Sequence, residues 1–302
     1  MKSDSTRHES SPLFPRLAVL GAVILWGGSF SAMRTALDVL PAWTVMWLRM
    51  VIALICILPL IRTVRLDGYR PGDWKLLVPT VLLQPCLYFW LESSALSLTS
   101  SAQAGIISAS VPLLVGFGAW LVFKESMRLA TAAGLALSLA GVAVLSLSGQ
   151  ATDQAPAPLV GNTLELLAMA CAAANMLLIR TLGRRYSPWS LTVLQVVTGC
   201  VFFSPGAVHL GSVSWDMFDQ RLILTLLFLG AGVTLGAFSL YNWSITRMNA
   251  TTAAAHINLI PVIAVGCGFF FLGETMTLVQ LVAALTVLAS VLMTQRPAPV
   301  RK

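Results

Sequence analysis

Ionisable side chains inside long apolar stretches are the residues of this sequence best suited to chemistry. Gln84, Tyr88 and Glu92 follow one another at intervals of four, which places them on one face of a predicted helix. A charged side chain at the centre of a membrane costs roughly 2.5 to 3.5 kcal/mol, so it is expected to face a cavity or a partner. Glu92 has two interpretations: a hydrogen bond to a neighbouring helix, or a role in a cavity, where it would contact an ammonium group or carry a proton.

A second predicted helix, beginning near residue 159, carries polar residues near its two ends. Glu165, Ala168, Ala172 and Asn175 share one face of this helix. We expect Glu165 to lie in the first turn, near the outer surface and in solvent, because the positive end of a helix dipole favours an acid. The alternative for Glu165 is a place in a cavity, and Asn175 is a candidate for that cavity.

The remaining candidates for contacting a substrate are polar or aromatic residues of other predicted helices. They are Trp26, Phe30, Gln103, Tyr241, Asn242 and His256. Trp26, Tyr88 and Tyr241 have two interpretations, as packing aromatics or as platforms for a substrate. His256 is either a satisfied imidazole in the core or a group of the cavity. A cavity between the two halves of the chain would collect all these candidates.

Three further residues are expected to act on the structure or on its movements. Arg49 lies within an apolar stretch, so we interpret it as a structural tie to helix-end carbonyl groups or to a carboxylate. Pro112 and Pro261, like Pro85, interrupt helical hydrogen bonding and are expected to seed bends. Bends at such positions are candidate gates.

The sequence lacks the motifs that several classes of pump and enzyme require. The sequence has no GxxxxGK[ST] phosphate loop and no GxSxG segment, so it predicts neither a nucleotide-driven pump nor a serine hydrolase. Its three histidines are too far apart in the sequence to suggest a metal centre. We therefore expect neither an enzyme nor a cofactor.

The composition indicates a membrane protein. Of 302 residues, 57% are hydrophobic and only 10% are charged, whereas about 25% are charged in an ordinary soluble domain. A helix needs about 20 apolar residues to cross the hydrocarbon layer. Ten such stretches begin near positions 17, 43, 75, 100, 128, 159, 188, 222, 250 and 277. The sequence therefore predicts an all-α protein with ten transmembrane helices, surrounded by lipid.

Two stretches repeat one pattern at an offset of 149 residues. Pro112 and Glu125 stand at the same spacing as Pro261 and Glu274, each pair within an apolar run that ends at the glutamate. Five helices per half is an odd number, so the second copy must start on the opposite face of the membrane. The predicted fold is therefore a pair of inverted five-helix repeats, an arrangement that many transporters use to build a central site.

This pattern divides the chain into five parts. They are a disordered cytoplasmic N-terminus (1–16), a first repeat (17–149), an outside linker (150–158), a second repeat (159–295) and a cytoplasmic tail (296–302). The linker is polar and contains prolines, which is typical of a loop.

The basic residues fix the expected orientation. With a cytoplasmic N-terminus, every Lys and Arg except Arg34, Arg49 and Arg221 falls on the inner side. Short inner loops of membrane proteins carry such an excess of Lys and Arg. The net charge of +7 is thus explained without a nucleic-acid partner. We expect a protein of the bacterial cytoplasmic (inner) membrane with both termini in the cytoplasm.

The predicted fifth and tenth helices differ from the others, because they contain no ionisable residue and carry small residues at intervals of four. Ala130, Gly134 and Ser138 follow one another at intervals of four in the first of these helices. Small residues at this spacing let helix backbones approach closely in lipid. This face has two interpretations: packing within one chain, or the interface of a homodimer.

Several short motifs, in order along both halves, resemble those of a known family. They are LWGGSF (25–30), WLRM (47–50), ALSLTSSAQA (95–104), Pro112 with FKE at Glu125, and Pro261 with LGE at Glu274. The chain resembles the EamA type of the drug/metabolite transporter superfamily, over roughly residues 17–295. The resemblance implies ten helices in inverted repeats, a central cavity and alternating access. The second half departs from the first, because Gln195 or Val196 stands near the place of Arg49.

The expected function is secondary transport of small metabolites. The resemblance implies a carrier for uptake or export of amino acids or other small metabolites, and export of amino acids, including neutral or aromatic ones, is the function that we expect. The candidate residues agree with a zwitterionic or neutral substrate, because there are too few basic groups among them to neutralise a phosphate. The alternatives are a membrane-embedded structural or sensory subunit, and a channel.

Overall fold

The computed structural model describes residues 13–59, 68–127, 129–183, 185–245, 247 and 256–294, and this part of the chain folds almost entirely into helices. In chain order the elements are α1 (Leu13–Leu37), α2 (Ala42–Ile57), α3 (Trp74–Val81), η2 (Leu82–Leu87), α4 (Tyr88–Leu96), α5 (Ser101–Ser108), α6 (Val111–Phe123), α7 (Leu129–Leu147), α8 (Pro158–Leu182), α9 (Pro188–Phe202), η3 (Ser204–Ser212), η4 (Trp215–Met217), α10 (Gln220–Leu227), η5 (Phe228–Ala237), α11 (Phe238–Ile245), α13 (Ile260–Leu272) and α14 (Leu278–Thr294).

The predicted start of the first helix was four residues late, because α1 already begins at Leu13. Pro15 lies in its first turn, where a missing backbone N–H does no harm. The segment 13–16, predicted to be disordered, is therefore helical, while 1–12 and the predicted tail 296–302 lie outside the described residues. The predicted ninth start, near 250, also lies outside them.

Many of these helices are long and apolar enough to cross a membrane. Among the described residues six qualify by length and composition, or seven if a bent pair, Pro188–Phe202 with Ser204–Gly211, is one span. Three shorter apolar helices, Ala42–Ile57, Ile260–Leu272 and Leu278–Met293, lie where the sequence predicted further spans. Large apolar side chains such as Phe270 and Leu129 are exposed, as a lipid-facing surface requires. The protein is a multi-pass membrane protein.

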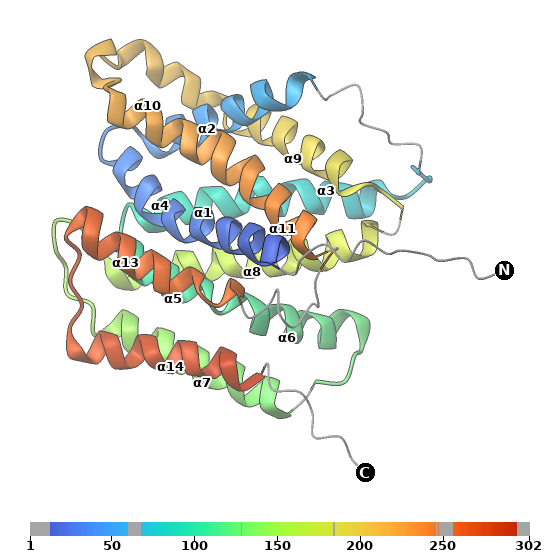
Figure 1. Cartoon of the computed structure of the whole chain (residues 1–302), viewed down its shortest axis with the longest axis vertical. Coiled ribbons are helices and arrows are strands. Elements are labelled where there is room, and N and C mark those ends of the chain that lie inside the picture. Colours follow the sequence, from blue (N-terminus) through green and yellow to red (C-terminus); the bar gives the residue numbers. More distant parts are fainter. Residues whose placement is uncertain are drawn as a thin grey trace.

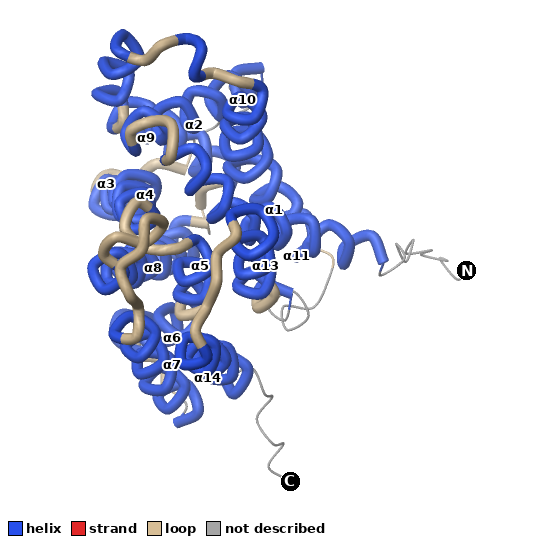
Figure 2. The backbone as a smooth tube through the Cα atoms, turned by 90° about the vertical axis from the view of Figure 1, so that its left-hand side faces the viewer, coloured by secondary structure: helices blue, strands red, loops and turns tan. Residues whose placement is uncertain are grey.

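The helices run side by side, with their axes roughly parallel (Figures 1 and 2). Helix α1 begins and α14 ends at the same end of the bundle, the right-hand end in Figure 1, which we call the terminal end. The loops that join α4 to α5, α7 to α8 and α13 to α14 lie at the left-hand end, which we call the opposite end. Helices α7 and α14 form one margin of the bundle, and α2, α9 and α10 form the other.

Recognisable local signals begin and end several helices. The side chains of Ser100, Ser187 and Asp219 accept hydrogen bonds from the first free N–H groups of α5, α9 and α10. Helix α13 ends at Gly273, whose φ of +65° lies in the left-handed region. Helix α6 ends in the same way at Lys124, with a φ of +56°. These two positions are 149 residues apart, like the glutamates that follow them.

Two spans are interrupted near their middle by a wider, π-helical turn. In the first, Pro85 lies within η2 and Gln84 has the extended angles φ −144° and ψ 120°. Proline explains this break, because it lacks an N–H and disfavours the helical conformation of the residue before it. The predicted bend at Pro85 is confirmed. The second π-helical stretch, η5, contains no proline and is part of the span Gln220–Tyr241, and no feature of the sequence predicted it.

Contacts between elements occur in matched pairs when the two halves are exchanged. Helix α1 packs against α13 and α8 against α6, while α4 packs against α8 and α11 against α1. Helix α2 contacts η5, and α9 contacts η2. Helices α7 and α14 pack against each other, where a side chain at Gly141 would meet Val287 at 2.8 Å. Gly134, Ser138 and Gly141 of α7 are buried, whereas Ala130 is exposed. Packing within the chain therefore accounts for most of this face, and a homodimer remains a prediction.

Candidate functional site

The break at η2 leaves backbone carbonyl groups without helical partners, and two amide side chains bind them. Asn175 of α8 donates a hydrogen bond from Nδ2 to the carbonyl oxygen of Thr80 at 2.7 Å. Gln195 of α9 donates from Nε2 to the carbonyl oxygen of Gln84 at 2.8 Å. A buried carbonyl group without a partner is costly, so these amides stabilise the broken helix. Asn175, predicted to bind substrate, is buried and already engaged in this contact.

The π-helical stretch η5 is held in a related way from α2. Thr234 donates from Oγ1 to the carbonyl oxygen of Leu229 at 2.8 Å, and Arg49 donates from Nε to Oγ1 of Thr234 at 2.9 Å. Arg49 and Gln195 are 146 residues apart, and each supports the π-helical stretch of the other half. In the sequence, Gln195 marked only a place where an arginine is missing. Its place opposite Arg49 in the repeat was the signal that could have revealed this role.

Arg49 also brings a positive charge into the interior, where only 4% of the residue is exposed. Its guanidinium carbon lies 4.2 Å from the centre of the Phe89 ring, a favourable cation–π arrangement. Its charge is attracted to Glu92 of α4, although no ion pair within 4.0 Å joins Arg49 to a carboxylate among the described residues. Arg49 thus ties α2 to η5 and α4, but the contacts described are to the Thr234 hydroxyl and the Phe89 ring rather than to the carbonyl groups or the carboxylate that were predicted.

Tyr88 and Glu92 share one face of α4, as predicted, and the Tyr88 hydroxyl donates a hydrogen bond to Oε1 of Glu92 at 2.5 Å. Glu92 is only 5% exposed. Tyr88 packs against both of the two largest apolar clusters of the described chain, so this pair lies between them. Gln84 does not continue the predicted stripe, because its extended backbone interrupts the helix.

Glu165 of α8 overturns the expectation of a solvated residue near the surface. It is 0% exposed, and neither carboxyl oxygen has a hydrogen-bond partner among the described residues. Its charge and that of Glu92 repel each other. Arg49, Tyr88, Glu92 and Glu165 therefore form a buried cluster, which we call the acidic cluster, on α2, α4 and α8.

The predicted aromatic residues divide into two environments. Trp26 of α1 lies against Phe238 and Tyr241 of α11, with ring centroids 5.3 Å apart in both pairs. Trp26 and Tyr241 are half-buried. Phe30 is 4% exposed and belongs to the largest apolar cluster. Phe30 is thus a packing residue, while the other two remain candidates for contacting a substrate.

The polar candidates are not gathered in one place. Gln103 is buried and accepts a hydrogen bond at Oε1 from Nδ2 of Asn162 at 2.8 Å, beside Thr99. This contact joins α5 to the start of α8, near the opposite end. His256 is half-buried just before α13. Asn242 belongs to α11, but its side chain lies outside the part that the structure describes.

The bends at Pro112 and Pro261 remain a prediction, although both prolines lie at helix starts. Each proline stands at the start of a helix, Pro112 in α6 and Pro261 in α13. Helix α5 ends at Ser108, just before α6 begins. The missing N–H of proline is harmless there, so each proline marks the start of a separate helical segment.

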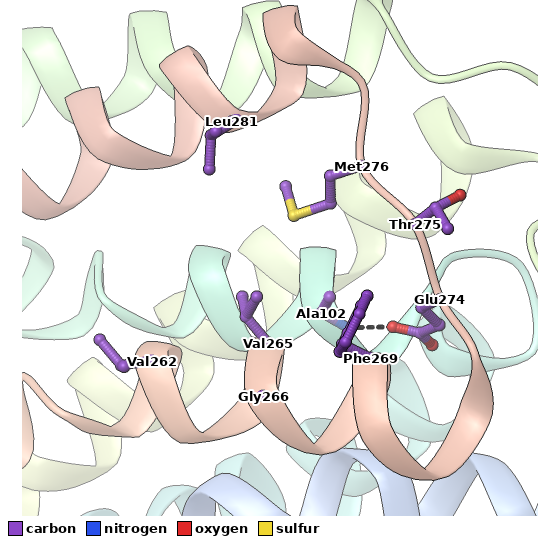
Figure 3. A pocket seen from close by; sticks show the side chains of 9 residues that line it. All are labelled: Ala102, Val262, Val265, Gly266, Phe269, Glu274, Thr275, Met276 and Leu281. Carbon is purple, nitrogen blue, oxygen red and sulfur yellow. Dashed lines mark hydrogen bonds between the residues drawn. The ribbon is translucent and has the colours of Figure 1, made fainter.

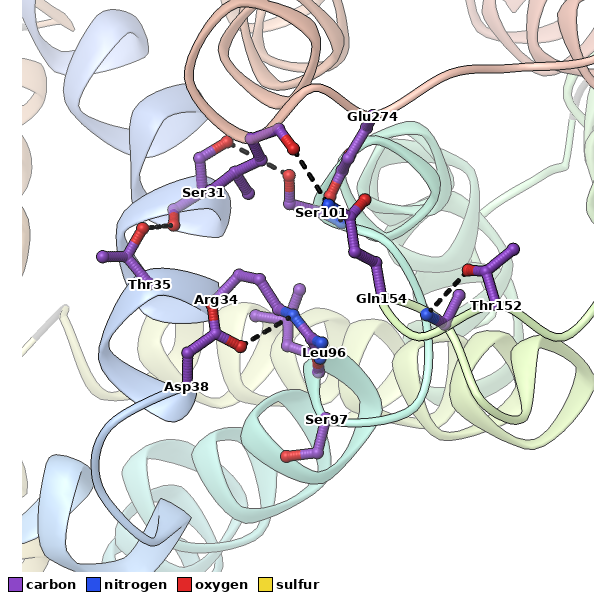
Figure 4. A network of polar contacts seen from close by, with 12 residues as sticks. Ser31, Arg34, Thr35, Asp38, Leu96, Ser97, Ser101, Thr152, Gln154 and Glu274 are labelled. Carbon is purple, nitrogen blue, oxygen red and sulfur yellow. Dashed lines mark hydrogen bonds and ion pairs between the residues drawn. The ribbon is translucent and has the colours of Figure 1, made fainter.

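At the opposite end a network of hydrogen bonds ties several helices together (Figure 4). Glu274, which follows α13, accepts hydrogen bonds from the backbone N–H groups of Ser101 and Ala102 at the start of α5, both at 2.8 Å. A carboxylate suits this place because the free N–H groups and the dipole of a helix start attract negative charge. Arg34 of α1 donates to the carbonyl oxygen of Leu96, the last residue of α4, at 2.6 Å.

The repeat counterparts of these two residues behave differently at the terminal end. Arg180 and Glu125 are counterparts of Arg34 and Glu274, and they pair with each other at 2.7 Å. Their side chains are 55% and 48% exposed, whereas Arg34 is 12% exposed. The opposite end is therefore tied between helices by residues whose counterparts at the terminal end lie on the surface.

A second contact at the terminal end joins two loops. Arg185, after α8, binds Asp73, before α3, with both guanidinium Nη atoms at 2.8 and 2.9 Å. The hydroxyl of Tyr186 donates to the same carboxylate at 2.7 Å. This hydrogen bond, with the N–H of Arg70 and the guanidinium of Arg185, holds the pKa of Asp73 below its ordinary value. Burial and the Asp73 carboxylate raise the pKa of Tyr186.

The described cavities do not lie at the acidic cluster. The larger, of about 560 Å³, opens between α5, α13 and α14 (Figure 3). Its lining is mostly apolar, and includes the exposed side chains of Val262 and Phe269. A smaller cavity of about 290 Å³ lies between α9, η5 and α11. The larger cavity is a crevice with apolar walls, suited to hydrocarbon rather than to a charged substrate.

Comparison with known proteins places the chain among transporters. An uncharacterized transporter of Bacillus subtilis, YvbV, is 28% identical over 89% of this chain and 87% of its own length. Another from the same species, YcxC, is 25% identical over 94% and 93%. The threonine/homoserine exporter RhtA of Salmonella typhimurium is 28% identical over 46% of each chain.

The same fold is present in a solved structure. A crystal structure whose title names no function matches 93% of this chain and 96% of its own, with a TM-score of 0.60 and 19% identity. The family model of the EamA-like transporters matches residues 13–147 and 159–296, and the reported relatives with a named function are transporters. The chain therefore belongs to the EamA-like transporter family.

Proposed function

We propose that this protein is a secondary transporter that exports small zwitterionic metabolites of the amino-acid class across the cytoplasmic membrane by alternating access. The observation that carries this proposal is the acidic cluster, which lies beside the π-helical stretches η2 and η5. Family membership supports transport, and the partial similarity to a threonine/homoserine exporter supports the substrate class.

The chemistry of the cluster favours a substrate with an ammonium group. Glu92 and Glu165 are two acids, against a single guanidinium from Arg49. A second cation is the natural complement of such a site. A phosphate would instead need several basic groups, as the anion-binding sites of proteins usually provide. The half-buried Trp26 and Tyr241 would offer apolar surface to the rest of the substrate.

The paired contacts between elements support an inverted repeat of ten spans. The family model matches each half of the chain separately. π-Helical stretches occur at η2 and η5, and left-handed helix ends at Lys124 and Gly273, in corresponding places of the two halves. Transporters with such repeats bind their substrate at discontinuous helices near the middle of the membrane.

The unequal ends of the bundle support alternating access. We take the terminal end as cytoplasmic because the loops with excess Lys and Arg lie there. Glu274 and Arg34 tie helices at the opposite end. At the terminal end Glu125 and Arg180 pair on the surface, and Asp73 and Arg185 join the loops before α3 and after α8. We infer that the ties of Glu274 and Arg34 close the outer end in this conformation and are broken in a second one.

Counterflow in proteoliposomes tests this function. Vesicles with the purified protein are loaded with one unlabelled amino acid at a time, and uptake of the labelled compound is measured. We expect saturable exchange for a subset of amino acids. Glu92→Gln should lower exchange at least about tenfold, which corresponds to about 1.4 kcal/mol in the transition state.

The control replaces a carboxylate by an amide at an exposed position. Asp153→Asn, in the loop at the opposite end, removes an exposed carboxylate and should leave exchange unchanged. Uptake that never saturates would indicate a channel. No exchange of any amino acid by well-folded protein would contradict the proposal and favour a structural or sensory subunit.

A further inference from the structure

Glu165 is a buried acid that nothing in the described structure neutralises. It lies on α8, is 0% exposed, and has no hydrogen-bond partner at either carboxyl oxygen among the described residues. An ionised carboxylate is very costly in such a place, whereas a protonated carboxyl group is much less so. Every other buried carboxylate described here has partners: Glu92 binds the Tyr88 hydroxyl, and Glu274 binds two backbone N–H groups.

The elements packed against α8 supply little compensating charge. These elements are α3, η2, α4, α5, α6 and α7. Helices α5, α6 and α7 contain no ionisable residue. The only ionisable side chain of η2 is Cys86, and α3 has only Lys75, which is exposed near Trp74.

Helix α4 therefore provides the ionisable neighbours of Glu165, which are Tyr88 and Glu92. The positive charge of Arg49 reaches this pair from α2. On α8 itself, Arg180 is paired with Glu125 on the surface. One arginine thus stands against two buried acids, which leaves the cluster one positive charge short when both acids are ionised.

We propose that Glu165 and Glu92 together hold one exchangeable proton, and that this proton couples transport to the proton gradient. The inference rests on the proposed function, and it assigns the coupling ion and its binding group. Since the proton and a substrate ammonium group would each supply the missing positive charge, they compete for the two acids. When the ammonium group binds, the O–H bond of the protonated acid breaks and the proton passes to water. Export of substrate is then exchanged for inward movement of a proton.

Infrared spectroscopy tests the proton without any substrate. Purified wild-type protein at neutral pH should show the carbonyl stretching band of a protonated carboxylic acid. Glu165→Gln should lose this band. Glu92→Gln should shift it, because this change removes the neighbouring charge. Glu125→Gln is the matched control and should keep the band, because Glu125 is exposed and paired with Arg180.

Two spectroscopic results would overturn the proposal. One is the absence of the acid band from wild-type protein at neutral pH. The other is an unchanged band in Glu165→Gln, which would assign the proton to a different group. The wild-type spectrum alone decides the first point, so the test does not depend on the folding of a variant.

Transport separates this inference from the proposed function. In proteoliposomes with a substrate that shows counterflow, a gradient of one pH unit should drive up to about tenfold accumulation, by one-for-one exchange. Glu165→Gln should abolish this accumulation. Counterflow that ignores the gradient in wild-type protein would refute proton coupling and leave the proposed function standing. No counterflow of any amino acid would refute the proposed function, whereas the infrared result would stand on its own.

Discussion

Arg49 joins α2 to η5 and α4, and this structural role predicts a loss of stability when Arg49 is replaced. Arg49→Ala would leave Thr234 without its donor and Phe89 without its cation. Removing one partner of a buried charged interaction typically costs about 3 to 5 kcal/mol. We therefore expect a marked loss of folded yield, measured by size-exclusion chromatography in detergent. Arg49→Lys should restore little, because the hydrogen bond leaves from Nε, which lysine lacks.

One outcome would contradict the structural role of Arg49. A well-expressed Arg49→Ala protein with changed preference among substrates would place Arg49 in the substrate site. Counterflow with the same panel of amino acids distinguishes the two cases.

The contacts of Asn175 and Gln195 at η2 predict an effect of their replacement on stability rather than on transport. Gln195→Ala and Asn175→Ala should each leave a carbonyl oxygen of the broken helix unpaired, at Gln84 and Thr80 respectively. An unsatisfied buried acceptor costs about 1 to 3 kcal/mol. We expect lower melting temperatures for both variants, with the set of exchanged substrates unchanged.

Thr192→Ala is the control for these variants. Thr192 is also on α9, but it is only partly buried and its hydroxyl hydrogen-bonds within its own helix. Melting temperatures equal to that of Thr192→Ala would mean that the breaks do not depend on these amides.

What could be predicted from the sequence differs between neighbouring residues of one site. The step of four between Tyr88 and Glu92 was enough to predict that they share a face, and α4 brings them into contact. The same reasoning failed for Gln84, where the effect of Pro85 on the preceding residue prevails over helical periodicity. Glu165 was misplaced because the periodicity of one helix does not tell which neighbours cover it. Its burial depends on packing against other spans.

At the scale of elements, a proline made η2 predictable, whereas η5 could not be predicted because it has no proline. Pro85 predicts the break in η2, whereas the ten residues of η5, FLGAGVTLGA, contain no proline. A glycine of η5 is the residue that could have indicated its close approach to α2. A side chain at Gly230 would lie 2.7 Å from Ile52 and 2.9 Å from the Arg49 carbonyl oxygen, so η5 needs glycine there to approach α2. Only a comparison of the two halves of the sequence could have suggested that a π-helical stretch occurs in each half.

The contact between the loops before α3 and after α8 predicts how stability depends on pH. The pKa of Asp73 is lowered in the folded protein, chiefly by the Tyr186 hydroxyl. An acid whose pKa is lowered by folding adds stability above its unfolded pKa, about 3.9 for aspartate, and loses it as the pH falls through the folded value. We expect the melting temperature of wild-type protein to fall below about pH 4 partly through this group.

Asp73→Asn should isolate this contribution. The variant should melt at a lower temperature than wild-type protein at neutral pH, and the difference should shrink as the pH falls through the lowered pKa of Asp73. Melting curves in detergent across this range provide the measurement. A constant difference between the two proteins at all pH values would show that the titration of Asp73 does not contribute.

At the scale of the whole molecule, the arrangement of the ends agrees with an even number of crossings. Helix α1 begins and α14 ends at the terminal end, whereas the loop between α7 and α8 lies at the opposite end (Figure 1). The basic loops favour a cytoplasmic position for the terminal end. The pairing of Asp73 with Arg185 also lies there, between loops that precede α3 and follow α8. Sequence charge and chain geometry thus predict one topology by separate arguments.

This topology predicts that the loop of residues 150–158 faces outward and that both termini are cytoplasmic. A cysteine at Asp153, which is exposed, should react in intact cells with a thiol reagent that does not cross the membrane. The measurement needs a background in which the five native cysteines are replaced. A cysteine at Tyr69, an exposed residue before α3 at the terminal end, is the matched control and should react only after the membrane is permeabilised. The reverse labelling pattern would invert the orientation, and with it the direction in which the ties of Glu274 and Arg34 close the transporter.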